Sequence, residues 1–393
     1  MRDSERFKAM KLAFFTSIVP DGNATTGFEI ANDAIIAGLR ELGHEVVIFG
    51  FKLPRQGKSR DTDVVTLGTR ELENSTAGTA QKLLWVMQAM RHGLPFAAAK
   101  LADFPVSQLA EAIERAGPFD GHILNSYQMA AAFPQLCDVP HIYVAHNVEH
   151  RSAAQNAAAV SSAAERWLYR RDERLLKKLE GELTQRARIV WTFSEADIDG
   201  HDLAPDHGCL LPLFVPSAAE PVDISEPEYD VGLIGTWSWQ PNFVGLQWFV
   251  EEVAPLLPPG MQIAIAGSIP TTSLRAGPNI QFLGRVESAN GFLDSVRVVP
   301  LISRGGTGVQ LKTIEAFQTG RPCVATQSSL RGIDELPSNC LAADDPPSFA
   351  EALTELVEVA KSGTLPAVDG QKFRDRQKTA LMAGLQRGIA HLA

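Results

Sequence analysis

One stretch, residues 296–326, constrains the fold more than any other part of the chain. It begins with an apolar run, Val296–Leu301, that predicts a buried strand, and a turn rich in glycine follows. A helical pattern covers Val309–Thr319 and ends at Gly320, where a left-handed cap is favoured. Pro322 then opens a second apolar run, Cys323–Ala325, that predicts another strand. Strand, helix and strand in this order predict a crossover unit of a parallel sheet.

The glycine turn presents a helix N-terminus whose free backbone N–H groups could bind a phosphate. Lys312 and Glu315 are three residues apart, so they share one face of this helix near its anion-binding end. A lysine there can neutralise phosphate, and a carboxylate can accept hydrogen bonds from the paired hydroxyls of a sugar. The alternative is that the two side chains pair with each other on a solvated helix face.

This segment resembles the donor-binding element of retaining glycosyltransferases of family four. The resemblance implies that Glu315 holds the ribose of a nucleotide-sugar, while Lys312 and the glycine turn face the diphosphate and the sugar. The donor-binding residues that it implies here are Arg304, Gly305, Gly306, Thr307, Gly308, Val309, Lys312 and Glu315. The family's usual pattern has a glutamate where this chain has Thr307, so the chain is more similar to a subgroup with a Gly-Gly-Thr-Gly turn.

Length and composition are consistent with two globular domains. A chain of 393 residues exceeds one ordinary core, and a turn-rich segment predicts a boundary between domains at 1–214 and 215–372. The formal net charge of −10 argues against nucleic-acid binding. Four cysteines without CxxC spacing predict neither a disulfide framework nor a zinc site, and favour a reducing cytoplasm. No apolar stretch approaches the roughly 20 residues of a membrane-spanning helix.

Strands and helices alternate along both halves of the chain. In the first half we expect strands at Lys11–Ser17, Glu45–Phe51, Asp120–Asn125, His141–Ala145 and Ile189–Phe193, and helices at Gly27–Leu42, Tyr127–Gln135 and Ala163–Gln185. In the second half we expect strands at Asp230–Gly235, Gln262–Gly267 and Asn279–Gly284 and a helix at Asn242–Ala254, before the segment described above. The segment 52–79 is polar and rich in turn residues, and no order of strands and helices can be predicted for it. Alternation of this kind predicts parallel sheets covered on both faces.

The predicted fold class is therefore α/β, with two doubly wound, Rossmann-like domains facing each other across a cleft. The order of elements resembles the GT-B fold over nearly the whole chain. This resemblance implies that the final helix, about 373–391, packs back on the first domain.

The loop after the first strand carries Gly22 and Gly27 and lies at the carboxyl end of a parallel strand, where open α/β sheets bind ligands. It is not a GxGxxG fingerprint, and ordinary turn chemistry is an equally good account of it. The family resemblance implies that this loop approaches the donor diphosphate and the acceptor, so we expect Gly22 and Gly27 in the donor site.

His146 to His150 matches H-x-x-E-H, a zinc peptidase pattern. That chemistry needs both histidines on one helix face, whereas the β-rich run before His146 predicts that it follows a strand. A buried structural histidine is a further alternative. The family resemblance instead implies that His146 contacts the donor hexose and stabilises charge at the anomeric centre.

No metal or other cofactor is expected. The Asp-x-Asp pairs at 61–63 and 197–199 do not follow a strand as a metal-dependent sugar transferase requires. The resemblance implies cationic side chains instead, commonly an Arg and a Lys after the first strand of the second domain. This chain has Gly235-Thr-Trp-Ser-Trp there, so Lys312 and Arg304 must neutralise more of the diphosphate.

A run from Arg166 to Arg188 is basic in a chain that is acidic overall. A solvated helix explains it; the alternative is a face with Trp167 that docks on anionic lipid.

The sequence thus predicts a retaining, metal-independent glycosyltransferase. Its donor is a nucleotide-diphosphate sugar, UDP- or GDP-linked, and its acceptor is a glycan or a lipid-linked molecule at the inner face of a membrane. His146, Lys312 and Glu315 are the predicted catalytic residues. A nucleotide-sugar epimerase and a non-catalytic nucleotide-sugar-binding subunit are the alternatives.

Overall fold

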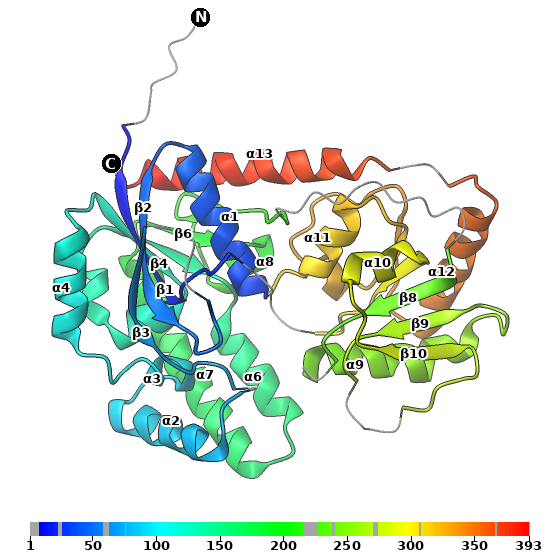
Figure 1. Ribbon diagram of the computed structural model, residues 1–393, viewed down its shortest axis with the longest axis horizontal. Helices are drawn as coiled ribbons and strands as arrows, with labels where there is room; N and C mark the ends of the chain where they lie inside the picture. Colours follow the sequence, from blue (N-terminus) through cyan, green and yellow to red (C-terminus); the bar gives the residue numbers. More distant parts are fainter. Residues whose placement is uncertain are drawn as a thin grey trace, which may run out of the picture. The chain divides into compact units, whose positions relative to one another are not determined.

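The computed structural model describes residues 8–22, 26–57, 63–74, 76–215, 227–237, 240–269, 274–305, 308–365 and 368–392. The chain divides into two compact units. Unit 1 comprises the residues up to Leu211 together with those from Thr379 onward, and unit 2 comprises Pro212–Lys378. Each unit has its own parallel sheet and its own hydrophobic core (Figure 1).

Unit 1 is built on a seven-stranded parallel sheet of order β3-β2-β1-β4-β5-β6-β7. Its strands are β1 Lys11–Ile18, β2 Glu45–Lys52, β3 Val64–Thr69, β4 Gly121–Asn125, β5 His141–Ala145, β6 Ile189–Thr192 and β7 Gly208–Leu210. Every residue of β4, β5 and β6 is buried, as continuous apolar runs predict for strands covered on both faces. The edge strand β3 is only partly buried.

The helices of unit 1 are α1 Gly27–Glu41, α2 Thr79–His92, α3 Phe96–Ala99, α4 Val106–Ala116, α5 Tyr127–Ala132, α6 Glu149–Ala159, α7 Ala163–Arg186 and α8 Glu195–Gly200. The predicted helix at 127–135 is shorter than expected, because a 3-10 turn begins at Pro134. Proline has no N–H to donate and disfavours the α conformation of the residue before it, and Phe133 accordingly has φ −133° and ψ 72°.

Unit 2 has a six-stranded parallel sheet of order β10-β9-β8-β11-β12-β13. Its strands are β8 Tyr229–Ile234, β9 Ile263–Ala266, β10 Ile280–Gly284, β11 Val296–Leu301, β12 Cys323–Ala325 and β13 Cys340–Ala342. Its helices are α9 Gln240–Trp248, α10 Ala289–Asp294, α11 Leu311–Gln318 and α12 Pro346–Lys361. The crossover unit predicted at 296–326 is confirmed: β11 pairs in parallel with β12, and Gly320 has φ 67° at the end of α11.

The helix expected at 242–254 is not uniform. After α9 the chain widens into a π turn at Phe249–Val253 and tightens into a 3-10 turn at Ala254–Leu256. Pro255 cannot donate an i→i−4 hydrogen bond, so the α-helical ladder cannot continue through it.

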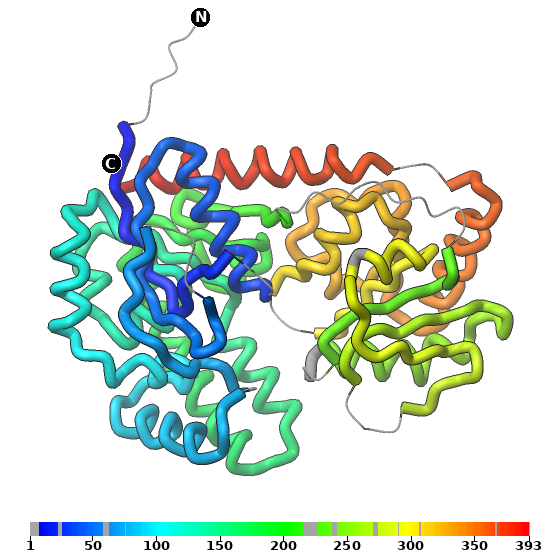
Figure 2. Tube along the Cα trace, in the orientation of Figure 1, coloured from blue at the N-terminus to red at the C-terminus, as the bar shows by residue number. Residues whose placement is uncertain are grey.

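Helix α13, Gly370–Ile389, begins in unit 2 and ends in unit 1. In unit 2, Phe373 packs edge-to-face on Phe317 with ring centroids 5.5 Å apart. In unit 1, a Cβ at Gly388 would lie 2.1 Å from the indole nitrogen of Trp191, so only glycine permits this approach. Figure 2 follows the chain into unit 2 and back. No helix of the described residues is long and apolar enough to cross a bilayer.

Candidate functional site

Each sheet has a point at which successive strands of the chain are added on opposite sides. This point lies between β1 and β4 in unit 1 and between β8 and β11 in unit 2. Open α/β sheets bind ligands outside the carboxyl ends of the strands at such a point. In unit 2 a hollow lies there. It is lined by Leu233, Ile234, Trp237, Asn242, Leu293, Val299, Pro300, Leu301, Ile302, Ser303, Gln310, Lys312, Thr313, Glu315, Ala316 and Ser329.

Lys312 lies in this hollow against the end of β8. Its ammonium is 5.2 Å from the ring centroid of Trp237, which is buried and donates a 2.8 Å hydrogen bond from Nε1 to Ala266 O. A Cβ on Gly235 would lie 2.8 Å from Lys312 Nζ and 2.9 Å from the Trp237 ring. The glycine therefore provides the space that the lysine head occupies.

The surroundings of Lys312 and Glu315 shift both pKa values toward the neutral forms. Lys312 keeps an exposed surface, yet atoms crowd around it, and this desolvation lowers its pKa to about 8. Burial raises the pKa of Glu315, and the lysine charge partly offsets that effect. Neither side chain forms a hydrogen bond or an ion pair with any described residue. The two side chains therefore form no direct ion pair in this structure, although the charge of each shifts the pKa of the other.

The glycine turn is described in part. Gly305, Gly308 and Val309 lie between β11 and α11, while Gly306 and Thr307 lie outside the described residues. Helix α11 begins at Leu311, two residues later than expected, because Gln310 is extended at φ −92° and ψ 99°. No described side chain caps this helix N-terminus. Thr313 N–H donates to Gln310 O, so the N–H groups of Leu311 and Lys312 are the ones that could bind an anion.

Arg304 has other partners. Its guanidinium donates a 2.6 Å hydrogen bond to Asp344 O and stacks 4.5 Å above the Trp248 ring. Arg304 does not line the hollow, so these contacts hold its charge elsewhere in unit 2.

A polar scaffold that the sequence analysis did not identify joins β11 to α11. Ser329 Oγ accepts a hydrogen bond from Ser303 N at 2.8 Å and donates one to Leu301 O at 2.8 Å. Thr313 Oγ1 donates to Ser329 O at 2.7 Å. The bond from Thr313 holds the first turn of α11, the helix that carries Lys312, against this scaffold. Ser303 and Ser329 lie two and four residues after the ends of β11 and β12, and no sequence motif marks either of them.

In unit 1, His146 lies directly after β5, as predicted. Its Nε2 is 2.8 Å from Asn125 Oδ1. Asn125 Nδ2 in turn donates to Asn32 Oδ1 at 2.6 Å and to Thr16 Oγ1 at 3.3 Å. Because Asn125 presents its oxygen to the imidazole, Nε2 carries the proton and Nδ1 is left as an acceptor.

Aromatic rings enclose the same histidine. The Phe28 ring lies 4.7 Å from the imidazole centroid and the Phe193 ring 5.0 Å. Desolvation lowers the pKa of His146 to about 3, so the ring is neutral at physiological pH. This histidine can therefore polarise a ligand or accept a hydrogen bond, but it brings no positive charge.

The zinc peptidase pattern does not form its helix. His146 precedes α6, which begins at Glu149, whereas His150 lies in the first turn. His150 Nδ1 is 2.7 Å from Glu180 Oε2, a buried carboxylate that also accepts from the backbone N–H groups of Glu149 and His150. Glu180 thus caps α6, and His150 has a structural role.

One acid of each Asp-x-Asp pair has another partner. Asp197 accepts a 2.6 Å hydrogen bond from Ser194 Oγ at the start of α8, and Asp63 lies 3.6 Å from Arg40. Asp61 lies outside the described residues. The described residues contain no group of three His, Cys, Asp or Glu side chains that could hold a metal.

Gly22 and Gly27 flank residues 23–25, which lie outside the described residues. Gly22 has φ 84°, a conformation that favours glycine, and Gly27 is the exposed first residue of α1. Between them Thr26 forms a capping box with Glu29. Thr26, in this loop, therefore has the structural role of capping α1.

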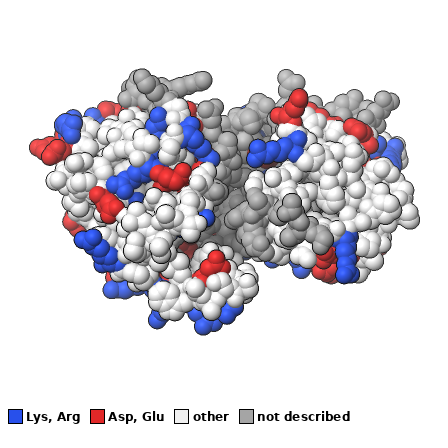
Figure 3. All heavy atoms as spheres, turned by 60° about the horizontal axis from the view of Figure 1, so that its bottom comes forward, with Lys and Arg blue, Asp and Glu red and all other residues white. Residues whose placement is uncertain are grey.

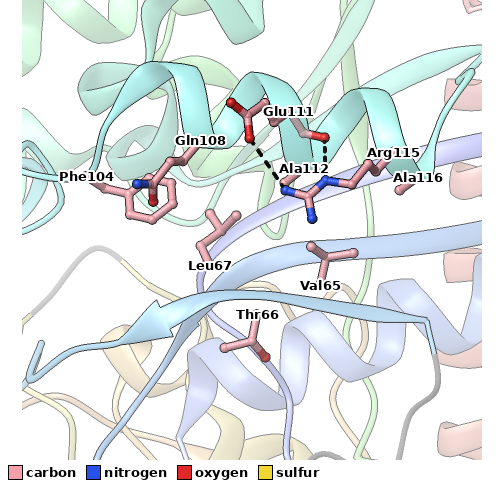
Figure 4. Close-up of a pocket in the computed structure, with 9 residues that line it drawn as sticks. All are labelled: Val65, Thr66, Leu67, Phe104, Gln108, Glu111, Ala112, Arg115 and Ala116. Carbon is pink, nitrogen blue, oxygen red and sulfur yellow. Dashed lines mark hydrogen bonds and ion pairs between the residues drawn. The ribbon is translucent and has the colours of Figure 1, made fainter.

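A second hollow in unit 1 lies between the edge strand β3 and helix α4 (Figure 4). Val65, Leu67 and Phe104 form its apolar part. Arg115, the cation among its lining residues, lies 3.8 Å from Glu111 Oε2 and donates to Glu111 O. Because this charge is already paired, the residues that line the hollow are poorly suited to binding an anionic donor.

Comparisons with known proteins agree with this architecture. Residues 228–359 match the family model for glycosyl transferases group 1. A search of curated proteins finds no match. Among solved structures, HepE from Anabaena in complex with UDP is 14% identical, with 97% of this chain and 98% of that chain covered and a TM-score of 0.61.

Two further structures show the same arrangement. Sucrose-phosphate synthase from Thermosynechococcus elongatus is 16% identical, with 97% of each chain covered and a TM-score of 0.61. WaaG, a glycosyltransferase involved in lipopolysaccharide biosynthesis, is 13% identical, with 96% of this chain and 98% of that chain covered and a TM-score of 0.61. The fold is GT-B. The predicted two-domain α/β fold class is thereby confirmed.

Within this GT-B fold, the matched residues begin just before β8 and end in α12. They include Lys312, Glu315 and the hollow that these residues line.

Proposed function

We propose that the protein is a glycosyltransferase that moves a sugar from a nucleotide-diphosphate donor to a glycan or lipid-linked acceptor. One observation supports this most strongly. The hollow at the carboxyl ends of β8 and β11 holds a lysine and a glutamate whose side chains form no hydrogen bond or ion pair with a described residue, beside a helix N-terminus that no described side chain caps. Such a set suits a nucleoside diphosphate, since the ammonium and the N–H groups bind phosphate and the carboxylate binds ribose hydroxyls.

The donor is a UDP- or GDP-linked sugar in this proposal. HepE was crystallised with UDP and with UDP-glucose, which makes uridine the first base to test. Lys312 and the N-terminus of α11 stabilise the diphosphate as it leaves, and Glu315 fixes the ribose. By the family resemblance, Gly305, Gly306, Thr307, Gly308 and Val309 are assigned to the sugar and phosphates of the donor, and Gly22 and Gly27 are assigned to donor binding as well.

The reaction proceeds with retention and without a metal. Charge that develops on the diphosphate is met by a preorganised cation and by backbone dipoles, so the chemistry needs no bound metal. His146 is assigned to the donor sugar, where a neutral imidazole can stabilise the forming oxocarbenium ion through its dipole. Its hydrogen bond to Asn125 supports this role because it fixes the tautomer.

In this proposal the protein is cytoplasmic and meets its acceptor at the inner face of a membrane. All four cysteines are free and buried, which suits a reducing compartment. Trp167 is 55% exposed on the basic helix α7, which supports a peripheral membrane contact.

An epimerase or a non-catalytic binding subunit would hold a similar donor. Incubation with radiolabelled UDP-glucose and GDP-mannose separates the three. A transferase releases free UDP or GDP, even if slowly to water, an epimerase converts the sugar while it stays attached, and a binding subunit does neither. Absence of nucleoside diphosphate release with every donor and acceptor tried would refute the proposal.

A further inference from the structure

Helix α2 is apolar on two opposite sides. Trp85 and Ala89 are buried against the rest of unit 1. On the other side, Leu83, Met87 and Met90 are 60%, 54% and 38% exposed and follow one another at the i, i+4, i+7 spacing of a single helix face. A helix of a globular protein normally places polar residues on its outer face, so this second apolar face indicates a surface that contacts something else.

Polar contacts hold α2 with this face outward. Arg171 of α7 donates hydrogen bonds to Ala89 O at 2.6 Å and to Leu94 O at 2.9 Å. Lys100 lies 4.3 Å from the Trp85 ring on the buried side. Because these contacts fix the rotation of the helix, the exposed side chains cannot simply turn inward.

The sequence of α2 carries charge of one sign only. The chain has a formal net charge of −10, yet no Asp or Glu occurs between Asn74 and Asp103. Lys82 and Arg91 are exposed on α2. The neighbouring helix α7 carries both Lys/Arg and Asp/Glu side chains, and Asp103 accepts a hydrogen bond from Gln88 of α2, so the cations of the outer face are Lys82 and Arg91. In Figure 3, the part of the surface that belongs to unit 1 has Lys and Arg along its lower edge, beside uncharged atoms.

We propose that the outer face of α2 docks on an anionic lipid bilayer, with Leu83, Met87 and Met90 among the acyl chains and Lys82 and Arg91 at the head groups. Exposed apolar side chains flanked by cations are the composition of helices that lie in a membrane interface. We favour a bilayer over an acidic groove of a protein partner for two reasons. The exposed apolar side chains lie together on one outer helix face, and α2 is bonded to α7, which carries the exposed Trp167. This docking face deepens the membrane contact of the proposed function, but it does not require the transfer reaction.

Vesicle flotation tests it with the full-length protein. We expect binding to vesicles of equal parts phosphatidylcholine and phosphatidylglycerol, weak binding to phosphatidylcholine alone, and loss of binding as salt rises. The variant Leu83→Gln/Met87→Gln/Met90→Gln should lower the partition coefficient at least about tenfold, because three inserted side chains are removed. Lys82→Gln/Arg91→Gln should weaken binding and reduce its salt dependence.

The control is Leu256→Gln/Leu336→Gln, which changes two leucines of unit 2 that are 53% and 42% exposed. It should bind vesicles like the wild type. Melting temperature and UDP titration check that each variant is folded; if the triple variant is not, the single change Met87→Gln takes its place.

Failure of the wild type to float with the anionic vesicles would overturn the inference, as would unchanged flotation of the α2 variants. A dimer in solution that the triple variant abolishes would assign the face to a second copy of the chain instead. UDP titration is independent of vesicles, so failure of the proposed function would be seen separately.

Discussion

Lys312 and Glu315 differ in which state of the reaction they are expected to stabilise. In the proposed reaction, the Glu315 carboxylate binds ribose hydroxyls that do not change during transfer, so its contribution is the same before and during bond breaking. The Lys312 ammonium in the same proposal faces phosphate oxygens whose negative charge grows as the glycosidic bond breaks. Substituting each residue should therefore change different kinetic constants.

Glu315→Ala should weaken UDP or GDP binding by roughly 1.5–3 kcal/mol, because a charge-assisted pair of hydrogen bonds is lost. Lys312→Ala should lower kcat more than it raises KM. Calorimetric titration with UDP, GDP and ADP, combined with steady-state kinetics, measures both. The control Glu355→Ala changes an exposed carboxylate on α12 and should leave binding unchanged. Equal nucleotide affinity in Glu315→Ala and wild type would disprove the ribose assignment.

The titration of Lys312 predicts a pH dependence. In the free protein its pKa is lowered to about 8 by desolvation, and a bound diphosphate should raise it again. The complex then binds more protons than the free protein, so affinity should fall as pH rises through about 8.

Calorimetry at pH 8 in two buffers of different ionisation enthalpy should detect this proton uptake. The variant Lys312→Arg keeps its charge at this pH and should show none. Uptake of the same size in that variant would show that another group titrates.

At the scale of elements, the end of β8 is shaped to receive the lysine from α11. Gly235→Ala would place a methyl group 2.8 Å from Lys312 Nζ and 2.9 Å from the Trp237 ring. Trp237 is held by its hydrogen bond to Ala266 O, so the lysine must move. We expect a loss of about 1–3 kcal/mol in stability and weaker UDP binding. Gly260→Ala, at a turn with no atom near the added Cβ, is the matched control for thermal melting and titration; similar effects of both would contradict this packing argument.

Elements with one clear pattern could be predicted from the sequence. The strands of the two sheet centres are short, continuous apolar runs, and β5 and β12 occur at the predicted residues. Helix α2 could not be predicted, because it is apolar on opposite faces and has no single stripe. Helix α6 consists mostly of small and polar residues and has the same difficulty.

The candidate site shows the same limit. Lys312, Glu315 and His146 stood out because each lies next to a strand or a glycine turn. The bond between Asn125 and Thr16 joins residues 109 positions apart, and no local pattern indicates such a pair. The tautomer of His146 follows from its hydrogen bond to Asn125, and the crowding of Lys312 follows from its contacts with Trp237 and Gly235. These partners are distant in sequence, so sequence alone could not predict the two pKa values.

At the scale of the whole molecule, the proposed reaction needs no metal, because the Lys312 ammonium and the N-terminus of α11 neutralise the diphosphate. Treatment with EDTA should therefore leave transfer activity nearly unchanged. Activity lost to EDTA and restored by zinc would support a metal site at His146 and His150. Restoration by manganese would instead favour the Asp-x-Asp pairs.

The path of helix α13 makes unit 2 an insertion within the sequence of unit 1. Trp191, Leu211 and Gly121 belong to the part of unit 1 that is synthesised first, yet they pack against Gly388, Gly384 and Leu392 from the last residues. A ribosome must therefore finish the whole chain before unit 1 can bury these positions. A fragment that stops at Leu211 exposes them, and unit 1 expressed alone needs its C-terminal segment joined to it by a linker.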